Sequence, residues 1–348
     1  MQKTNFQKVQ EFNRAFDMAP KHPSTYESSS VNECGVLQHN AFIHIRPELF
    51  INEPRIIKLR LDLIDEEIKE LHEAITNNDI IETRDALADI LYVVYGMADV
   101  LGINIDTYFN TYFFNILDST NIDNTHKNIK NKNNMKLIND IYKDTEDNTN
   151  NSCKCNCVFN SVENKNKNNK NNNEKCNTQH KELNISNFDK IQILLECCPD
   201  TLTNINCYNK HFIQDNLQII QNNISFNYKK LETYCLEKNN DVDIKKFNII
   251  TSYINNILIY VYSYTYILEY NSDIDFTIVH NSNMSKLCDS QLDAENTVID
   301  YINRFKLGDS PYNSPYYYEL PELNKWIVKN KSTGKALKNI KYHKVVFM

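Results

Sequence analysis

The chain is poor in glycine and in apolar character: it holds 5 glycines in 348 residues, and its mean hydropathy is -0.56. A large α/β fold needs many tight turns, so this composition favours an α-helical bundle. Basic residues are not in excess either, because the formal net charge is -7 and the pI is near 5.8. Proteins that bind nucleic acid polymers normally carry a basic surface, so we expect no nucleic acid polymer as a partner. Free nucleotides remain compatible, since a bound metal supplies positive charge locally.

The early residues are polar, so we expect no signal peptide, and the 10 cysteines have no regular spacing. We therefore expect a cytoplasmic protein rather than a secreted disulfide scaffold. Residues 247–268 carry no charge and approach membrane-spanning length, but their asparagines, hydroxyl groups and tyrosines suit a lipid-facing helix poorly. We expect no membrane contact, and a helix packed in the bundle or at a subunit interface. Residues 191–195 and 212–220 are predicted to form shorter helices against it.

Two aspartates stand out in a strongly apolar segment. Asp85 and Asp89 lie one helical turn apart in residues 84–98, which are apolar around almost the whole circumference after Ala86. A helix of this kind is built to be buried. Two ionised carboxylates there cost several kcal/mol per ion unless a cation compensates them. Because no Lys or Arg follows Arg84 in the segment, the simplest partner is a hard divalent cation, Mg²⁺ or alternatively Mn²⁺, held by oxygen ligands.

A second acidic group precedes the first by one short Asn-rich turn. Each helical residue advances by about 100° around the axis, which places Glu67 and Glu70 at the edges of the apolar face of residues 61–71 and Glu66 further toward solvent. Alone, these residues would be read as a solvated face. Together with the aspartates they predict a metal site. Its candidate ligands are Glu67, Glu70, Asp85, Asp89 and Glu66.

Glu82 falls on the same arc as the two aspartates but has a local explanation. Asp79 followed three residues later by Glu82 resembles a capping box, and acids favour the positive end of the helix dipole. We therefore interpret Glu82 as structural, in a helix that begins near Asp79.

This arrangement of two acidic pairs resembles the all-α NTP pyrophosphohydrolases, the MazG-like and phosphoribosyl-ATP pyrophosphohydrolase superfamily. Residues 85–96 look like its DALADLLYVVYG block, and residues 279–287 closely match its VHxSNMSK segment. Residues 9–16 look like the opening helix of the same subgroup. One departure is that much of the superfamily reads Glu-x-x-Asp in the second pair, whereas Ala86 stands three residues before Asp89 here.

The resemblance implies Mg²⁺-dependent hydrolysis between the α- and β-phosphates of a nucleoside triphosphate, giving a nucleoside monophosphate and pyrophosphate, in nucleotide-pool house-cleaning. Glu66 or Glu67 would orient or deprotonate the attacking water, and the sequence does not decide between them. Asn283 and Lys286 are spaced i,i+3, so a helix would point both the same way. The predicted catalytic residues are Glu66, Glu67 and Lys286. The predicted substrate contacts are Asn283, Lys286, His280, Asn13 and Trp326, with Phe12 and Phe16 as further base-pocket candidates.

The expected fold is all-α, a MazG-like helical bundle with a long, partly disordered insertion and a small C-terminal extension containing a β-hairpin. The predicted domains are residues 1–117, the N-terminal half of the catalytic bundle; 118–247, the insertion; and 248–348, the C-terminal half with its tail. Residues 121–181 are rich in Asn, Lys and Asp, and such a stretch buries too little apolar surface to offset its ordering entropy. We expect disorder there. Compared with the proteins it resembles, the chain interposes everything between roughly residues 109 and 273, and we expect catalysis to survive removal of this insertion.

Two further motifs are weak. Cysteines 153, 155 and 157 with Cys176 and His180 invite a zinc hypothesis, but Cys-x-Cys-x-Cys is not the usual knuckle spacing, and reduced thiols are preferred. Residues 326–338 invite a phosphate-loop interpretation, yet no earlier Gly precedes the Gly-Lys step. A β-hairpin turning at Thr333 and Gly334 is the better account, and its lysines could cover a triphosphate in the manner of a lid.

Two alternatives stay open. Phosphoribosyl-ATP would undergo the same phosphate chemistry, and metal ligands cannot distinguish it from a nucleoside triphosphate. A non-catalytic helical interaction protein, in which the acids form only a polar seam, is the competing class. Because a short acidic helix pair cannot easily enclose its own apolar face, and because related enzymes assemble as dimers or tetramers, we also expect a homodimer or higher homo-oligomer.

Overall fold

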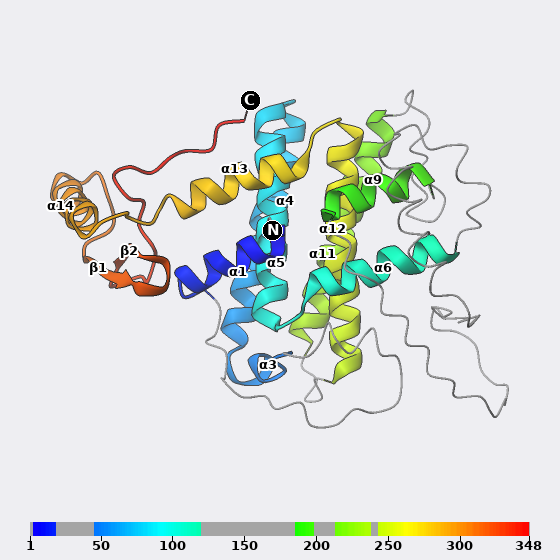
Figure 1. The fold of residues 1–348 in the computed structure, drawn as a ribbon, viewed down its shortest axis with the longest axis horizontal. Helices are drawn as coiled ribbons and strands as arrows, with labels where there is room; N and C mark the ends of the chain where they lie inside the picture. The colour runs from blue at the N-terminus through cyan, green and yellow to red at the C-terminus, as the bar shows by residue number, and fades with distance from the viewer. Residues whose placement is uncertain (1–2, 19–44, 120–184, 198–212, 238–242, 348) are drawn as a thin grey trace, which may run out of the picture. The chain divides into compact units, whose positions relative to one another are not determined.

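The computed structural model describes residues 3–18, 45–119, 185–197, 213–237 and 243–347 (Figure 1). These residues are mostly α-helical, with one two-stranded hairpin near the C-terminus, which confirms the predicted fold class. The helices are α1 (Asn5–Ala15), α3 (Glu48–Asn52), α4 (Pro54–Thr76), α5 (Ile80–Leu101), α6 (Ile105–Ser119), α9 (Asn187–Cys197), α11 (Ile213–Leu236), α12 (Ile244–Ile267), α13 (Ser272–Met284) and α14 (Gln291–Leu307). The strands are β1 (Pro315–Leu320) and β2 (Lys325–Asn330).

Four long helices form a bundle in which each packs against two others: α4 on α5, α5 on α12, α12 on α11, and α11 on α4 (Figure 1). Helix α4 contributes a stripe of apolar side chains at helical spacing, and all of them are at most 4% exposed: Ile57, Leu61, Ile64, Ile68 and Leu71. This spacing buries one face of α4 and leaves its acids at the margins. The core is therefore shared by helices from both halves of the chain.

Helix α5 is the most enclosed of the four, as its apolar sequence predicts. The side chain of Asp79 accepts hydrogen bonds from the backbone amides of Ile81 and Glu82, which confirms the predicted N-cap. The helix ends at Gly102, whose φ of 74° is left-handed and suits a residue without Cβ. Between these ends α1, α4, α12 and α13 all contact α5.

The helix predicted from residues 247–268 is α12, and Phe247, Ile250, Ile254 and Ile257 on it are fully buried in the bundle. The two shorter helices predicted beside it are present as α9 and α11, and both contact α12. Among the described helices, none is by itself long and apolar enough to cross a membrane; α5 and residues 105–114 of α6 meet the length and composition test only as a pair, bent by 107°.

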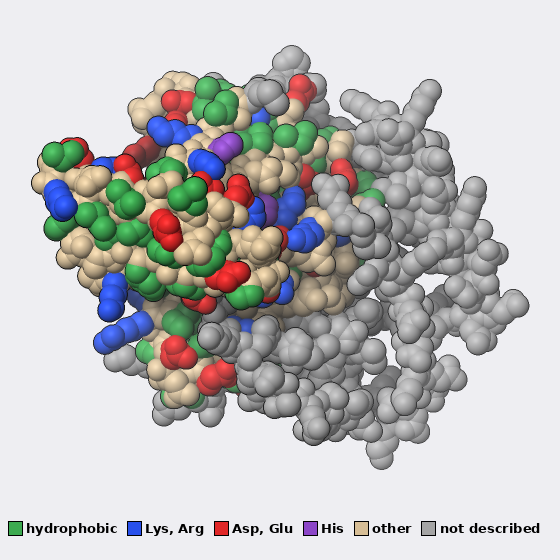
Figure 2. Space-filling view, turned by 60° about the vertical axis from the view of Figure 1, so that its left-hand side comes forward, with side chains coloured by type: hydrophobic (Ala, Val, Ile, Leu, Met, Phe, Trp, Pro, Cys, Tyr) green, Lys and Arg blue, Asp and Glu red, His purple; other side chains and the backbone are tan. Residues whose placement is uncertain are grey.

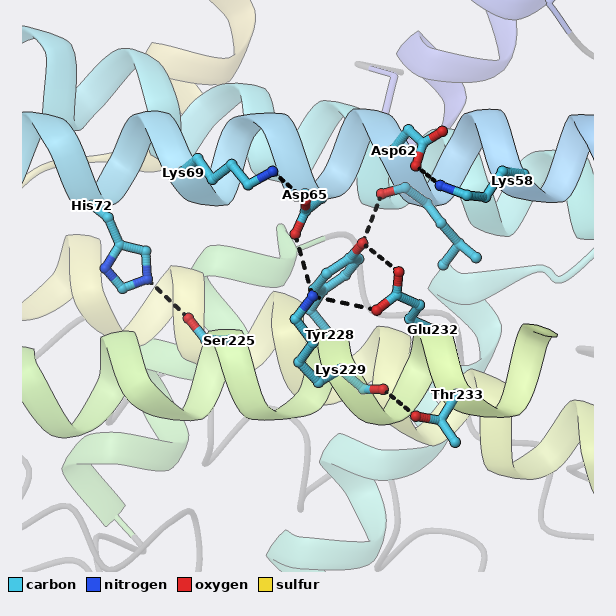
Figure 3. A network of polar contacts seen from close by, with 11 residues as sticks. Lys58, Asp62, Asp65, Lys69, His72, Ser225, Tyr228, Lys229, Glu232 and Thr233 are labelled. Atoms are coloured by element: carbon cyan, nitrogen blue, oxygen red, sulfur yellow. Dashed lines mark hydrogen bonds and ion pairs between the residues drawn. The ribbon is translucent and has the colours of Figure 1, made fainter. Parts of the chain in front are cut away.

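Helix α11 is joined to α4 by a row of polar contacts (Figure 3). Gln221 donates a hydrogen bond to Nδ1 of His72 at 2.6 Å, and Nε2 of the same ring lies 3.0 Å from the Ser225 hydroxyl. The Tyr228 hydroxyl donates to the carbonyl oxygen of Leu61 at 3.2 Å. At about 100° per residue, His72 and Leu61 lie on the side of α4 opposite Glu67 and Glu70, so α11 packs against the face of α4 that points away from these acids.

Strands β1 and β2 pair antiparallel, with Pro315 opposite Asn330 and Leu320 opposite Lys325, and the chain reverses between them at Pro321–Leu323. The predicted reversal at Thr333 and Gly334 is also present, with Gly334 at a φ of 71°, but it follows this hairpin. After it, Lys329 and Ala336 form an isolated bridge. The predicted hairpin is therefore confirmed, while its main turn lies earlier in the chain.

Several predictions concern residues beyond the described ranges. The Asn-rich tract at residues 121–181 and the zinc hypothesis lie outside them, the latter resting on Cys153, Cys155, Cys157, Cys176 and His180.

Candidate functional site

The acidic cluster lies where α4 and α5 pack together. Glu67 on α4 and Asp85 and Asp89 on α5 are half-buried, whereas Glu66 and Glu70 are exposed. Glu67 is flanked by buried Ile64 and Ile68, as the helical wheel predicts. The i,i+4 spacing of the aspartates places both on one face of α5, and this face lies toward α4, because the charges of both aspartates act on Glu67. We call Glu67, Glu70, Asp85 and Asp89 the acidic cluster.

The pKa shifts of these four carboxyls indicate that their charges act on one another. Burial, then the charge of Asp89, raises the pKa of Glu67 to about 8. Burial, then the charge of Asp85, raises the pKa of Asp89 to about 7, and burial with Glu82 raises that of Asp85 to about 6. The pKa of Glu70 also rises, through burial and the charge of Glu66. Such a cluster is unstable in its fully ionised form unless a cation joins it.

Two oxygens of the cluster are buried without any hydrogen-bond partner: Oε2 of Glu67 and Oδ1 of Asp85. A buried carboxylate oxygen without a donor is costly, so its presence points to a ligand. In the part of the chain that the structure describes, no three Asp, Glu, His or Cys side chains stand close enough together to hold an ion as they are. The donor chemistry thus fits a hard cation, while chelation would require the side chains to turn inward.

A chain of hydrogen bonds runs beside the acidic cluster. Lys286 donates to Oδ1 of Asn283 at 2.7 Å, which leaves the amide group of Asn283 to donate to the Tyr92 hydroxyl. That hydroxyl lies 3.1 Å from Nδ1 of His280. Because ammonium groups only donate, Lys286 makes the Asn283 carbonyl an acceptor, and the amide group of Asn283 therefore faces the Tyr92 hydroxyl. Burial raises the pKa of Tyr92 well above its usual value and lowers that of His280 to about 4, so Tyr92 keeps its proton and His280 is neutral.

Lys286 links this chain to the acids. Its charge opposes the rise in the pKa of Asp89, and its ammonium lies 5.8 Å from the centre of the Phe12 ring. Burial lowers the pKa of Lys286, and the charges of Lys338 and Lys335 lower it further. The segment just after α13 therefore presents the cation Lys286 to the acidic cluster, and the charges of Lys335 and Lys338 reach this cation.

The structure brings together most of the predicted site residues but leaves others apart. Asn13 is 1% exposed and bridges Asp99, at 2.7 Å, and Arg60, at 3.3 Å, in a buried network. Trp326 lies on β2, where it contacts the Tyr317 ring and pairs with Cys288 through the backbone. Neither residue contacts the acidic cluster, so nothing in their contacts indicates substrate binding.

Tyr92 is a site residue that the sequence prediction missed. It follows Asp89 by three positions, so it shares the face of α5 that carries both aspartates. That spacing was visible in the sequence, but a tyrosine on an apolar helix is ordinarily a core residue. Its hydroxyl partner comes from α13, 188 positions later, and only the fold reveals it.

A cavity of about 350 Å³ lies beside the same end of α13. It is lined by Glu11, Asn281, Met284, Ser285, Leu287, Asp289, Leu323, Lys325, Asn339, Lys341 and His343. The acidic cluster is not part of this lining. The face in Figure 2 mixes acidic, basic, histidine and apolar side chains, and no broad basic surface covers its described residues.

Comparison with known proteins gives two matches. A curated relative, the uncharacterized protein L479 of Acanthamoeba polyphaga mimivirus, is 45% identical over 103 residues, which make up 30% of this chain and 33% of the relative. The match thus spans about a third of that relative's length. No solved structure matches the chain. Residues 44–112, which contain the whole acidic cluster, match the phosphoribosyl-ATP pyrophosphohydrolase family and so carry a domain of the MazG-like all-α NTP pyrophosphohydrolase superfamily.

Proposed function

We propose that this protein is a Mg²⁺-dependent pyrophosphohydrolase that cleaves nucleoside triphosphates between the α- and β-phosphates. One observation carries the proposal: four carboxyls with few cationic neighbours face a lysine that is oriented by Asn283, Tyr92 and His280. The match of residues 44–112 to the phosphoribosyl-ATP pyrophosphohydrolase family supports pyrophosphate chemistry on this scaffold.

The acidic cluster fits Mg²⁺ in its chemistry. Hard divalent cations prefer carboxylate oxygens, and one buried carboxylate oxygen each of Glu67 and Asp85 has no hydrogen-bond donor. Glu67, Glu70, Asp85 and Asp89 would hold the metal, with Glu66 as an outer ligand. Mn²⁺ would substitute. When bound, the metal would neutralise phosphate charge and make a coordinated water more acidic.

The protein's own groups supply the remaining tasks. Glu66, which is exposed, or Glu67, whose pKa is raised, would orient or deprotonate the attacking water. Lys286 would contact a phosphate oxygen through its ammonium, which Asn283 holds in position. Since Tyr92 keeps its proton and His280 is neutral near pH 7, the hydrogen bonds that orient Asn283 do not change with protonation there.

The test is a panel of canonical and damaged ribo- and deoxyribonucleotides, scored for monophosphate and pyrophosphate in the presence of Mg²⁺. We expect equal amounts of the two products from at least one triphosphate, and none with EDTA. Asp89→Asn should abolish release while retaining the helical circular dichroism signal. Release of inorganic phosphate would mean that another bond is cut, and no release with Mg²⁺ or Mn²⁺ would favour a helical interaction protein.

Phosphoribosyl-ATP is the second candidate substrate, because it gives its name to the matched family. It presents the same scissile bond on a bulkier nucleotide. Including it in the panel decides the matter by comparing kcat/KM values. We also propose that the protein works as a homo-oligomer in the cytoplasm. Light scattering of the purified protein would measure its oligomeric state.

A further inference from the structure

We propose that Lys335 and Lys338, on the tail that follows β2, form the binding site for the terminal phosphates of the substrate and so restrict it to triphosphates. This inference rests on the proposed function, because it names the part of the substrate that this tail contacts. Its evidence is the path of the tail past Lys286 and the environment of the two lysines.

Asn339 anchors the tail beside Lys286. Its side-chain amide donates to the carbonyl oxygen of Leu287 at 2.8 Å and approaches that of Ser285 at 3.5 Å. These two carbonyls flank Lys286 in the chain. Lys338 precedes Asn339, so its backbone is held next to the end of α13 by a buried side chain that is 6% exposed.

The residues between the two lysines are anchored as well. Leu337 is 1% exposed, and its backbone amide donates to the carbonyl oxygen of Val328 at 2.8 Å. Ala336 is half-buried, and it packs against the same apolar cluster as Phe12, whose ring centre lies 5.8 Å from the Lys286 ammonium. Burial of Ala336, Leu337 and Asn339 therefore turns Lys335 and Lys338 outward, and both are exposed.

Both lysines rest on aromatic rings rather than on acids. The ammonium of Lys335 lies 5.7 Å from the centre of the Tyr312 ring, and that of Lys338 lies 4.5 Å from the centre of the Tyr342 ring. Among the described residues, no carboxylate forms an ion pair with Lys335, Lys338 or Lys286. Other tail cations do have acidic partners, as Lys341 has in Asp293 at 2.7 Å.

Lys335 and Lys338 both repel the ammonium of Lys286, so an anion bound near them would be stabilised. The charges of Lys338 and Lys335 lower the pKa of Lys286 even though Asp89 opposes them, so each of these two ammonium groups lies within electrostatic range of that of Lys286. Lys286 therefore lies within electrostatic range of an acid, Asp89, and of two lysines that have no acidic partner among the described residues. A metal-bound polyphosphate complements both, with its cation toward the acids and its terminal phosphates toward the tail. A monophosphate reaches only Lys286.

The experiment compares wild type with the double variant Lys335→Ala/Lys338→Ala. Because both side chains are exposed, the fold should be retained. We expect the KM for the best triphosphate to rise about tenfold, with kcat changed by less than about twofold, and the preference for tri- over diphosphate to shrink by a similar factor. The matched control is Lys331→Ala/Lys344→Ala, which removes two exposed tail lysines that do not influence Lys286; its KM should stay at the wild-type value.

Binding of inorganic tripolyphosphate with Mg²⁺, measured by calorimetry, separates this inference from the proposed function. Loss of that binding in the Lys335/Lys338 variant, but not in the control, supports the tail site even if wild type hydrolyses no nucleotide, in which case only the proposed function fails. An active wild type whose double variant binds tripolyphosphate and turns over triphosphate like the parent overturns the tail site and leaves the proposed function intact.

Discussion

The hydroxyl of Tyr92 on α5 lies 3.1 Å from Nδ1 of His280 on α13. This contact joins the helix that carries Asp85 and Asp89 to the helix that carries Asn283, and Lys286 follows that helix by two residues. We predict that Tyr92→Phe lowers kcat/KM for the best nucleotide by about five- to tenfold, the equivalent of one lost hydrogen bond of about 1 kcal/mol. Steady-state kinetics with Mg²⁺ would measure it.

Tyr316→Phe is the matched control for Tyr92→Phe, because Tyr316 lies on β1 and is 41% exposed. It should change neither kcat nor KM. If Tyr92→Phe behaves like this control while Lys286→Ala is inactive, the orientation of Lys286 does not depend on Tyr92.

Stability of the metal-free protein should depend on pH through the acidic cluster. The pKa of Glu67 is raised from its ordinary 4.5 to about 8, and that of Asp89 from 3.8 to about 7. A carboxyl whose pKa is higher in the folded chain stabilises the fold below the unfolded pKa and loses this contribution as pH rises through the folded value. In EDTA, the melting temperature should therefore fall between pH 5 and pH 8.5.

Glu67→Gln tests the cause, because a neutral amide removes one of the titrating groups. Its melting temperature should fall less than that of wild type over the same pH range, while Glu322→Gln, in the exposed turn between the strands, should fall as wild type does. Mg²⁺ should raise the wild-type melting temperature more at pH 8 than at pH 5.5, since protons compete for the ligands. Equal curves for Glu67→Gln and wild type would rule out Glu67 as a source of the effect.

Local sequence signals predicted the helix α5 well. Its apolar circumference, the cap at Asp79 and the i,i+4 spacing of Asp85 and Asp89 are all properties of neighbouring residues. The same holds for α12, whose uncharged sequence marks a buried helix. Short-range periodicity is sufficient for such elements because each helix buries its own apolar face.

Short-range periodicity does not predict contacts between segments that are far apart in the sequence. Helix α11 falls inside the range predicted as an insertion, yet its Tyr228 donates to the carbonyl of Leu61, 167 positions earlier. Nothing in either segment alone encodes that pairing. The prediction of a homo-oligomer rests in part on an apolar face of the acidic helix pair that a partner would cover. In the structure, α11 packs on α4 and α12 packs on α5, so helices of the same chain cover this pair. The homo-oligomer stays a prediction, supported only by likeness to related enzymes.

Helix α11 should be required for stability. Leu231 is 0% exposed on α11, so Leu231→Ala leaves a cavity and should lower the free energy of unfolding by about 2–5 kcal/mol. Phe226→Ala on the same helix is the control, because Phe226 is 57% exposed and should change stability by at most about 0.5 kcal/mol. Urea unfolding followed by circular dichroism would compare them, and equal effects would mean that α11 does not belong to the core.

Gly96 and Arg60 should be coupled where α4 crosses α5. A Cβ on Gly96 would meet Nη1 of Arg60 at 2.9 Å, and Arg60 is 4% exposed and donates to Asn13 and to the carbonyl of Met18. Alanine improves helix propensity by about 1 kcal/mol, but displacing a buried guanidinium from its acceptors costs about 1.5–3 kcal/mol. Gly96→Ala should therefore destabilise the protein by about 1 kcal/mol.

A double-mutant cycle tests that coupling directly. In an Arg60→Met background the guanidinium no longer constrains the site, so Gly96→Ala should become neutral or stabilising by up to about 1 kcal/mol. Urea unfolding of the four proteins gives the interaction energy. If Gly96→Ala has the same effect in both backgrounds, the guanidinium moves aside without loss, and the close approach of α4 and α5 does not depend on a glycine at this position.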